Sequence, residues 1–194
     1  MLVRSRLSKL VSILLLSGTF CVALSYPSAG QSSKAGVSTK ATPLAQIKDW
    51  FNKYDGLRRQ AQMNPKEREK ADALLAKGLA IVMPGPDKVE SQGLFQTLES
   101  KNAQAAEQLK NLPLYPETEQ LHRGYYKFFS DTASLFTDYL KVQNNLMAPD
   151  PLTGKPLMGQ LLLRKKSLEE LDAANKTLDL ELRGKFQIPE YRYQ

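Results

Sequence analysis

One pair of residues in this sequence has the types and the spacing of a metal site. Glu119 and His122 lie three positions apart in a segment that we expect to be helical, and side chains at that spacing share one face of a helix. Helical bundles build two-metal centres from such a pair together with carboxylates that project inward from the other helices. The sequence therefore offers a metal site at Glu119 and His122 as one hypothesis.

The other carboxylates that this site would need are hard to place. Glu90 and Glu99 lie among polar neighbours, and the acids near residue 170 flank a leucine seam instead of occupying it. The Glu119–His122 pair also lies in the first two turns of its helix, near one end of a bundle. We therefore favour a structural interpretation, in which the negative charge of Glu119 stabilises the helix N-terminus and His122 is a surface or boundary residue.

The sequence gives little support to catalysis. His122 is the only histidine, so a Ser-His-Asp triad would have to use it, and no serine follows the strand-to-helix pattern of a nucleophile elbow. The acidic residues are scattered over amphipathic segments, and nothing places two of them across a cleft. We expect no catalytic residues and no cofactor.

The N-terminus is typical of an exported protein. Arg4, Arg6 and Lys9 precede an apolar run over residues 10–24, which is shorter than the roughly 20 residues that span a bilayer. Small residues at the end of this run predict cleavage after Ser25, so residues 1–25 form a signal peptide. The alternative is an N-terminus that stays uncleaved as a membrane anchor. After cleavage the chain is expected to be periplasmic, lumenal or extracellular.

Cleavage changes what the rest of the chain can do. Cys21 is the only cysteine and is removed with the signal, which excludes disulfides and cysteine-ligated metals from the mature protein. A bacterial lipoprotein has a small residue directly before its lipidated cysteine. Phe20 precedes Cys21 here, so lipidation of Cys21 is disfavoured. The net charge falls from +7 to +4, and the basic residues alternate with acids, so we expect no nucleic-acid partner. Membrane contact is expected only through an uncleaved N-terminus.

The rest of the sequence predicts one all-α domain. We expect a flexible linker over residues 26–42, a single helical bundle of four to five helices over 43–185, and a tail over 186–194. Five helical stretches are separated by breaks that contain proline. Whether the first two are separate helices or one helix kinked at Pro65 is left open. The expected boundary signals are Thr42 as an N-cap, capping boxes at Asn64–Glu67 and Asp87–Glu90, helices over 116–147 and 156–183, and Gly184 as a C-cap.

Apolar spacing predicts how the last two helices pack. The fourth has two parallel apolar stripes, from Leu121 to Leu146 and from Tyr126 to Leu140, so we place it at the centre of the bundle. The fifth has a heptad-like leucine seam, and Arg164 and Asn175 occupy two positions within it. The two helices are expected to form a long antiparallel C-terminal hairpin.

These features favour an exported, non-enzymatic interaction or structural module of the cell envelope, with an envelope or extracellular protein as its partner. Polar residues in a seam often fix partner choice, and aromatic residues in a tail can form a docking strip. The alternatives are a ferritin-like metal-binding bundle and a carrier of a small apolar ligand. The expected partner-binding residues are Arg164, Asn175, Tyr191, Arg192 and Tyr193.

Overall fold

The apolar periodicity of the sequence is realised as helices throughout the described part of the chain. The structure, a computed structural model, describes residues 41–77, 81 and 83–192. The predicted signal peptide and residues 26–40 of the predicted linker lie outside these residues. The described residues are all-helical, with four helices packed together and no strand. The elements are α2 (Leu44–Ala61), α3 (Pro65–Ala76), α4 (Pro86–Lys110), α5 (Glu119–Asn144) and α6 (Leu157–Phe186).

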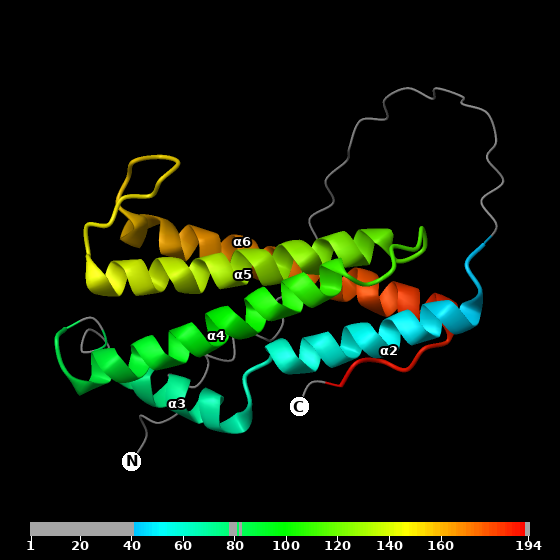
Figure 1. Cartoon of the computed structure of the whole chain (residues 1–194), viewed down its shortest axis with the longest axis horizontal. Coiled ribbons are helices and arrows are strands. Elements are labelled where there is room, and N and C mark those ends of the chain that lie inside the picture. The colour runs from blue at the N-terminus through cyan, green and yellow to red at the C-terminus, as the bar shows by residue number, and fades with distance from the viewer. Residues whose placement is uncertain (1–40, 78–80, 82, 193–194) are drawn as a thin grey trace, which may run out of the picture.

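The first two helices are separate, which answers the question left open by the sequence. Gln62 has an extended backbone that ends α2, and Pro65 is the first residue of α3. The capping box is confirmed, because the Glu67 N–H donates to Asn64 Oδ1 at 2.9 Å and the Asn64 N–H donates to Glu67 Oε2 at 2.8 Å. Together α2 and α3 follow the length of α4 and act as one broken helix of the bundle (Figure 1).

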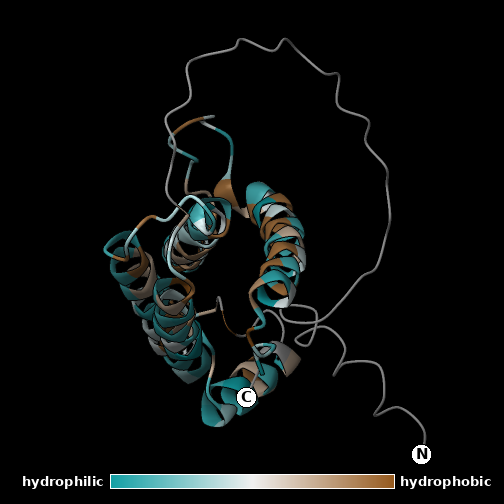
Figure 2. Cartoon of the chain, turned by 90° about the vertical axis from the view of Figure 1, so that its right-hand side faces the viewer, coloured by the Kyte–Doolittle hydropathy of each residue, from teal (hydrophilic) through white to brown (hydrophobic). Residues whose placement is uncertain are grey.

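The three long helices run antiparallel to their neighbours in the chain. α4 and α5 lie side by side over most of their length, and α6 packs on α5 (Figure 1). Seen along the bundle, α6 stands on one side of α5 and α4 on the other (Figure 2). α6 has only a limited contact with α2, so α5 covers most of its buried face. The predicted central position of α5 is confirmed.

The leucine seam of α6 faces α5 as the heptad pattern predicted. Leu157, Leu161 and Leu168 are buried against residues of α5. Asn175 is also buried, and it packs so closely on Gly124 that a Cβ at that glycine would lie 2.1 Å from Asn175 Oδ1. A Cβ at position 124 would therefore require the Asn175 side chain to move.

Three clusters of buried side chains form the core. The largest joins α2, α4 and α5 through aromatic rings, with Trp50 stacked on Tyr54 and Tyr54 edge-on to Tyr125. A second cluster lies between α5 and α6 at the opposite end, and a third lies under α3. The aromatic residues of α5 other than Tyr126, which is exposed, thus pack in or against the core. The largest cluster consists of Ile47, Trp50, Phe51, Tyr54, Leu57, Ala105, Ala106, Leu109, Leu121, Tyr125 and Phe129.

A buried ion-pair network joins α2 to α6. Asp179 accepts hydrogen bonds from Arg58 Nη1 at 2.9 Å and from Arg183 Nε at 3.0 Å. Asp55 accepts two more from the other nitrogens of Arg183. Arg58, Asp179 and Arg183 are each at most 4% exposed. Burial acts to lower the pKa of Arg183, but its hydrogen bonds to Asp55 and Asp179 outweigh this, so its pKa is raised and its guanidinium stays charged.

Aromatic rings and the C-terminal tail cover this network. The Arg58 guanidinium lies 4.9 Å from the Tyr125 ring centroid and 4.0 Å from that of Tyr191, distances at which a cation is attracted to a ring face. The Pro189 carbonyl accepts a hydrogen bond from Arg183 at 2.7 Å. The tail therefore packs back on the bundle.

Several predicted helix boundaries were wrong, among them both ends of the helix predicted over 116–147, which the structure places at Glu119–Asn144. α2 begins after Pro43, and the Thr42 N–H donates instead to Glu117. α4 is capped by Gly85, which has no side chain to form a capping bond, and Asp87 lies inside the first turn, where it pairs with Lys77. α6 continues past Gly184 to Phe186, which packs on the core, and Gln187 takes the left-handed cap conformation.

Removal of Asp179 should destabilise the fold strongly, because it would leave two buried guanidinium groups without their shared carboxylate. We expect Asp179→Ala to lower the free energy of unfolding by about 3–5 kcal/mol in urea titrations. The control is Glu170→Ala, whose exposed pair with Lys166 should contribute less than ~1 kcal/mol. Equal stabilities of the two variants would contradict the role given to the network.

Gly124→Ala tests the close approach of α5 and α6. The new Cβ would overlap Asn175, and we expect a loss of about 1–3 kcal/mol in the free energy of unfolding. Gly93→Ala is the matched control, since nothing lies within 4 Å of its Cβ position, and it should stabilise by about 0.5–1 kcal/mol. A second change, Asn175→Ala, should restore part of the loss; a Gly124→Ala protein as stable as the wild type would show that the helices are not this close.

Candidate functional site

The predicted metal pair lies in the first turn of α5, at the end of the bundle where α2 begins. Glu119 is bound to Arg123 of the same helix, with Arg123 Nη2 to Glu119 Oε1 at 2.8 Å. His122 is turned inward, and its ring lies 6.2 Å from the Trp50 ring centroid. Within the described residues, no three His, Cys, Asp or Glu side chains are grouped to hold a metal ion. The metal hypothesis therefore has two candidate ligands here and no third.

His122 is a buried imidazole beside a cation. Its Nδ1 atom has no hydrogen-bond partner within the described part of the chain. Its pKa is lowered, first by burial and then by the charge of Arg123, while Glu119 acts in the opposite direction. The neutral ring is therefore the form that fits the fold.

Two open grooves are the best-formed hollows of the described residues. One, of about 380 Å³, is lined by His122, Arg123, Lys110, Leu114 and Tyr126. Its two basic residues, Lys110 and Arg123, are paired with Glu107 and Glu119, so the positive charge of this groove is neutralised at the surface. Neither hollow is an enclosed apolar chamber of the kind that a ligand carrier needs.

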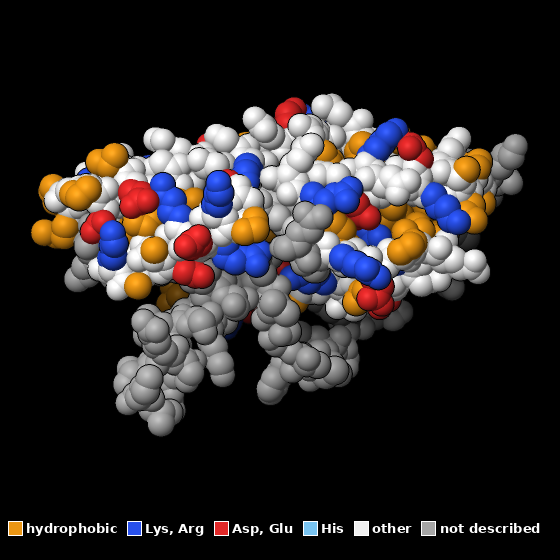
Figure 3. Space-filling view, turned by 90° about the horizontal axis from the view of Figure 1, so that it is seen from below, with side chains coloured by type: hydrophobic (Ala, Val, Ile, Leu, Met, Phe, Trp, Pro, Cys, Tyr) orange, Lys and Arg blue, Asp and Glu red, His pale blue; other side chains and the backbone are white. Residues whose placement is uncertain are grey.

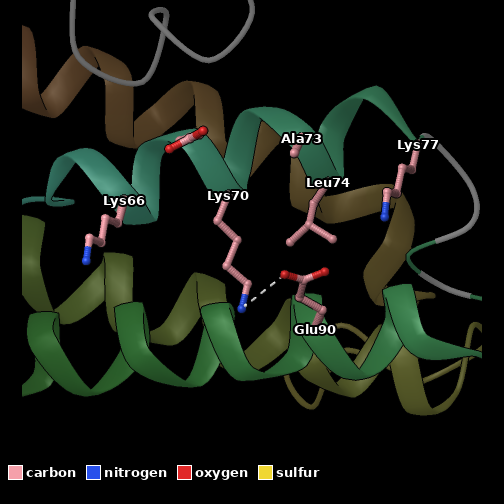
Figure 4. Close-up of a pocket in the computed structure, with 7 residues that line it drawn as sticks. Lys66, Lys70, Ala73, Leu74, Lys77 and Glu90 are labelled. Carbon is pink, nitrogen blue, oxygen red and sulfur yellow. Dashed lines mark ion pairs between the residues drawn. The ribbon is translucent and has the colours of Figure 1, made fainter.

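The other groove, of about 280 Å³, lies between α3 and α4. Figure 4 shows Lys66, Lys70 and Lys77 along α3, facing Glu90 of α4, and Leu74 at the middle of the groove. Lys70 Nζ lies 3.4 Å from Glu90 Oε1, and Leu74 is buried in the core beneath α3. We interpret this groove as the packing seam of a short helix.

The structure shows where the predicted partner-binding residues lie. Arg164 bridges Asp138 and Asp150 within the chain, and Asn175 is buried on Gly124. Tyr191 covers Arg58, and Arg192 is exposed beside it, while Tyr193 lies outside the described residues. Internal contacts account for Arg164, Asn175 and Tyr191, and partner binding by any of the five stays a prediction.

Exposed apolar side chains gather instead at the hairpin end of α5 and α6. We call six of them the apolar tip, and they lie within residues 146–163, although this segment is a small part of the described chain. They are half of the twelve large hydrophobic side chains that are exposed in the described residues. Figure 3 shows hydrophobic side chains at the left-hand end, where the α5–α6 loop and the start of α4 lie in Figure 1. The apolar tip consists of Leu146, Met147, Leu152, Met158, Leu162 and Leu163.

The loop that carries the apex of the tip, residues 145–156, is held by its own hydrogen bonds. Asp150 is central: its Oδ1 accepts from the N–H groups of Leu152 at 2.8 Å and Thr153 at 3.1 Å. Its Oδ2 accepts from Arg164. The backbone bonds to Leu152 lower the pKa of Asp150, against burial, and Arg164 lowers it further. These bonds hold the backbone at Leu152, whose side chain is the most exposed of the tip at 90%. We call Leu152 the apex of the tip.

Sequence reasoning missed the apolar tip. Leu146 was predicted to lie in the buried stripe of the fourth helix, which is wrong, because α5 ends at Asn144 and Leu146 is exposed. Leu162 and Leu163 follow Leu161 directly, and this run has more leucines than one seam can bury. That surplus was the available signal.

No family model matches the sequence, and comparison with curated proteins and with solved structures gives no match. Among the described residues, no helix combines the length and the apolar character needed to cross a membrane.

The lowered pKa of His122 should make stability depend on pH. In the unfolded chain a histidine has a pKa of about 6.5, whereas in the fold burial and the charge of Arg123 lower the pKa of His122. The free energy of unfolding should therefore be constant above that pH and fall as pH drops from about 6.5 to the folded pKa. The measurement is an NMR titration of the single histidine, which reads the folded pKa directly.

A matched pair of variants separates the causes. Arg123→Gln removes the nearby positive charge and should raise the pKa of His122 toward about 6.5, whereas Lys88→Gln, near the start of α4 at the other end, should leave it unchanged. A folded pKa at or above that of a free histidine would contradict the burial of the ring.

Proposed function

We propose that this chain is a non-enzymatic interaction module of the cell envelope, and that it attaches through the apolar tip. The observation that carries the proposal is the concentration of six exposed large apolar side chains within residues 146–163. Single exposed leucines are common on protein surfaces, but a local concentration of exposed apolar side chains is typical of places where a partner is contacted.

The construction of the tip supports this proposal. The loop 145–156 is fixed by Asp150, and Asp150 is held in turn by Arg164. A surface that is ordered before binding loses less conformational entropy when it binds. The bundle supplies the support, since α5 and α6 are joined below the loop by the buried leucines of their seam.

The proposal can be tested by attachment to isolated envelopes. Met147→Ser with Leu152→Ser should weaken retention on envelopes of the source cell by about tenfold or more, because each buried side chain of this size contributes about 1.5–3 kcal/mol. The measurement is the fraction of purified protein that co-sediments with the envelopes. Both residues are exposed, so the free energy of unfolding should change by less than ~0.5 kcal/mol for each.

Two leucines outside the tip give a matched control. Leu44 and Leu180 are each about half exposed, and changing both to Ser removes similar apolar surface elsewhere. This control should be retained like the wild type. If the tip variant and the wild type were retained equally, the tip would not be the attachment surface; if the wild type itself washed off, the module would not act at the envelope.

A further inference from the structure

The backbone N–H groups of the tip are hydrogen-bonded within the loop. From Met147 to Leu157 every peptide N–H has an acceptor within the loop, and the three prolines of this segment have none to satisfy. Asn145 accepts hydrogen bonds from the N–H groups of Met147 and Ala148. Asp150 accepts from those of Leu152, Thr153 and Gly154. The N–H groups of Asp150, Lys155 and Leu157 donate to Lys155, Thr153 and Ala148, in that order. A peptide N–H taken from water without a partner costs several kcal/mol in hydrocarbon. The loop avoids that cost for its N–H groups.

The same feature argues against a partner that pairs its backbone with the loop. A protein that adds a strand to an edge needs free N–H groups to bond, and residues 147–157 offer none. The loop also projects from the bundle (Figure 1), and Leu152 within it is 90% exposed. Hydrocarbon chains adapt to a projecting apolar side chain without a matching pocket.

The charges around the tip favour an anionic surface. Residues 145–170 contain four basic residues and three acids, a net charge of +1. Asp150 is buried and paired with Arg164, and Glu169 and Glu170 lie farther along α6, each paired with a lysine, so the positive charge of Lys155 is the one left nearest to Leu152. Lys155 lies three residues from the apex and has no ion pair within the described residues, whereas Lys165 and Lys166 are paired with glutamates four residues on.

We propose that the surface bound by the apolar tip is an anionic lipid membrane, into whose interface Leu152 and its apolar neighbours insert while Lys155 stays among the lipid phosphates. This inference rests on the proposed function, since it names the partner of the same tip. Insertion is shallow and reversible, as a few apolar side chains with a basic flank bind a bilayer surface without spanning it.

The test uses the protein as the cell exports it, with its N-terminus established by mass spectrometry. It is mixed with vesicles of phosphatidylcholine alone or of phosphatidylcholine with phosphatidylglycerol. Wild type should bind the phosphatidylglycerol vesicles and bind the neutral ones much more weakly, and binding should fall as salt rises. Leu152→Ser should weaken binding by about tenfold, Lys155→Gln should weaken it with a smaller salt dependence, and Leu180→Ser should leave it unchanged.

Insertion has a direct optical readout, because the chain has a single tryptophan, Trp50, and it is buried. Leu152→Trp adds an exposed indole whose emission should shift to the blue on phosphatidylglycerol vesicles, while Leu180→Trp should not respond. Equal binding to both kinds of vesicle, or an unshifted Leu152→Trp, would overturn the inference. If no vesicle binds but tip-dependent attachment to envelopes persists, the partner is a protein and the proposed function stands; if neither occurs, both fail.

Discussion

Asp179 is the group on which the α2 end of the bundle depends. It is a single carboxylate between two buried guanidinium groups, and Asp55 supplies the second negative charge that balances them. Buried ion pairs add little stability compared with apolar residues of the same shape, but a broken pair is costly. Since α2 and α6 otherwise touch little, we interpret the network as the contact that selects how these two helices meet.

The position of the tail follows from this network. Arg183 donates to the Pro189 carbonyl, and Arg58 lies under the ring of Tyr191. The low dielectric that strengthens the pairs requires that water be kept away, and the returning tail does this on the side that the helices leave open. Gln187, in the left-handed conformation, provides the turn that sends the chain back. An aromatic tail that the sequence could present as a docking strip thus has a structural role in the cover.

Local patterns made the helices predictable, and distant pairings made the rest unpredictable. The seam leucines of α6 and the Asn64–Glu67 capping box depend on residues three to seven positions apart. Arg58 and Asp179 are 121 residues apart, and Asp55 and Arg183 are 128 apart. In sequence Asp179 and Arg183 look like an ordinary i,i+4 surface pair. Periodicity also shows that a helix has an apolar face without showing which neighbour covers it, so the uncovered leucines of α6 and the lowered pKa of His122 were out of reach.

The two ends of α6 solve the same charge problem in different ways. At the end of α6 next to the loop 145–156, Arg164 bridges Asp138 and Asp150, and Lys141 pairs with Asp138 at 3.1 Å. Two acidic and two basic side chains thus neutralise one another here as well. Among the residues that the structure describes, however, no aromatic ring is found over this arginine, and about a third of its side chain is exposed. Arg164 thus keeps part of its contact with water, although Asp138 and Asp150 are buried, so this network is less fully desolvated than the one around Asp179 and holds the loop while partly exposed. The network around Asp179 therefore depends on its burial under the tail. The tip, in contrast, is ordered while its apolar side chains stay exposed, so another surface can contact them directly.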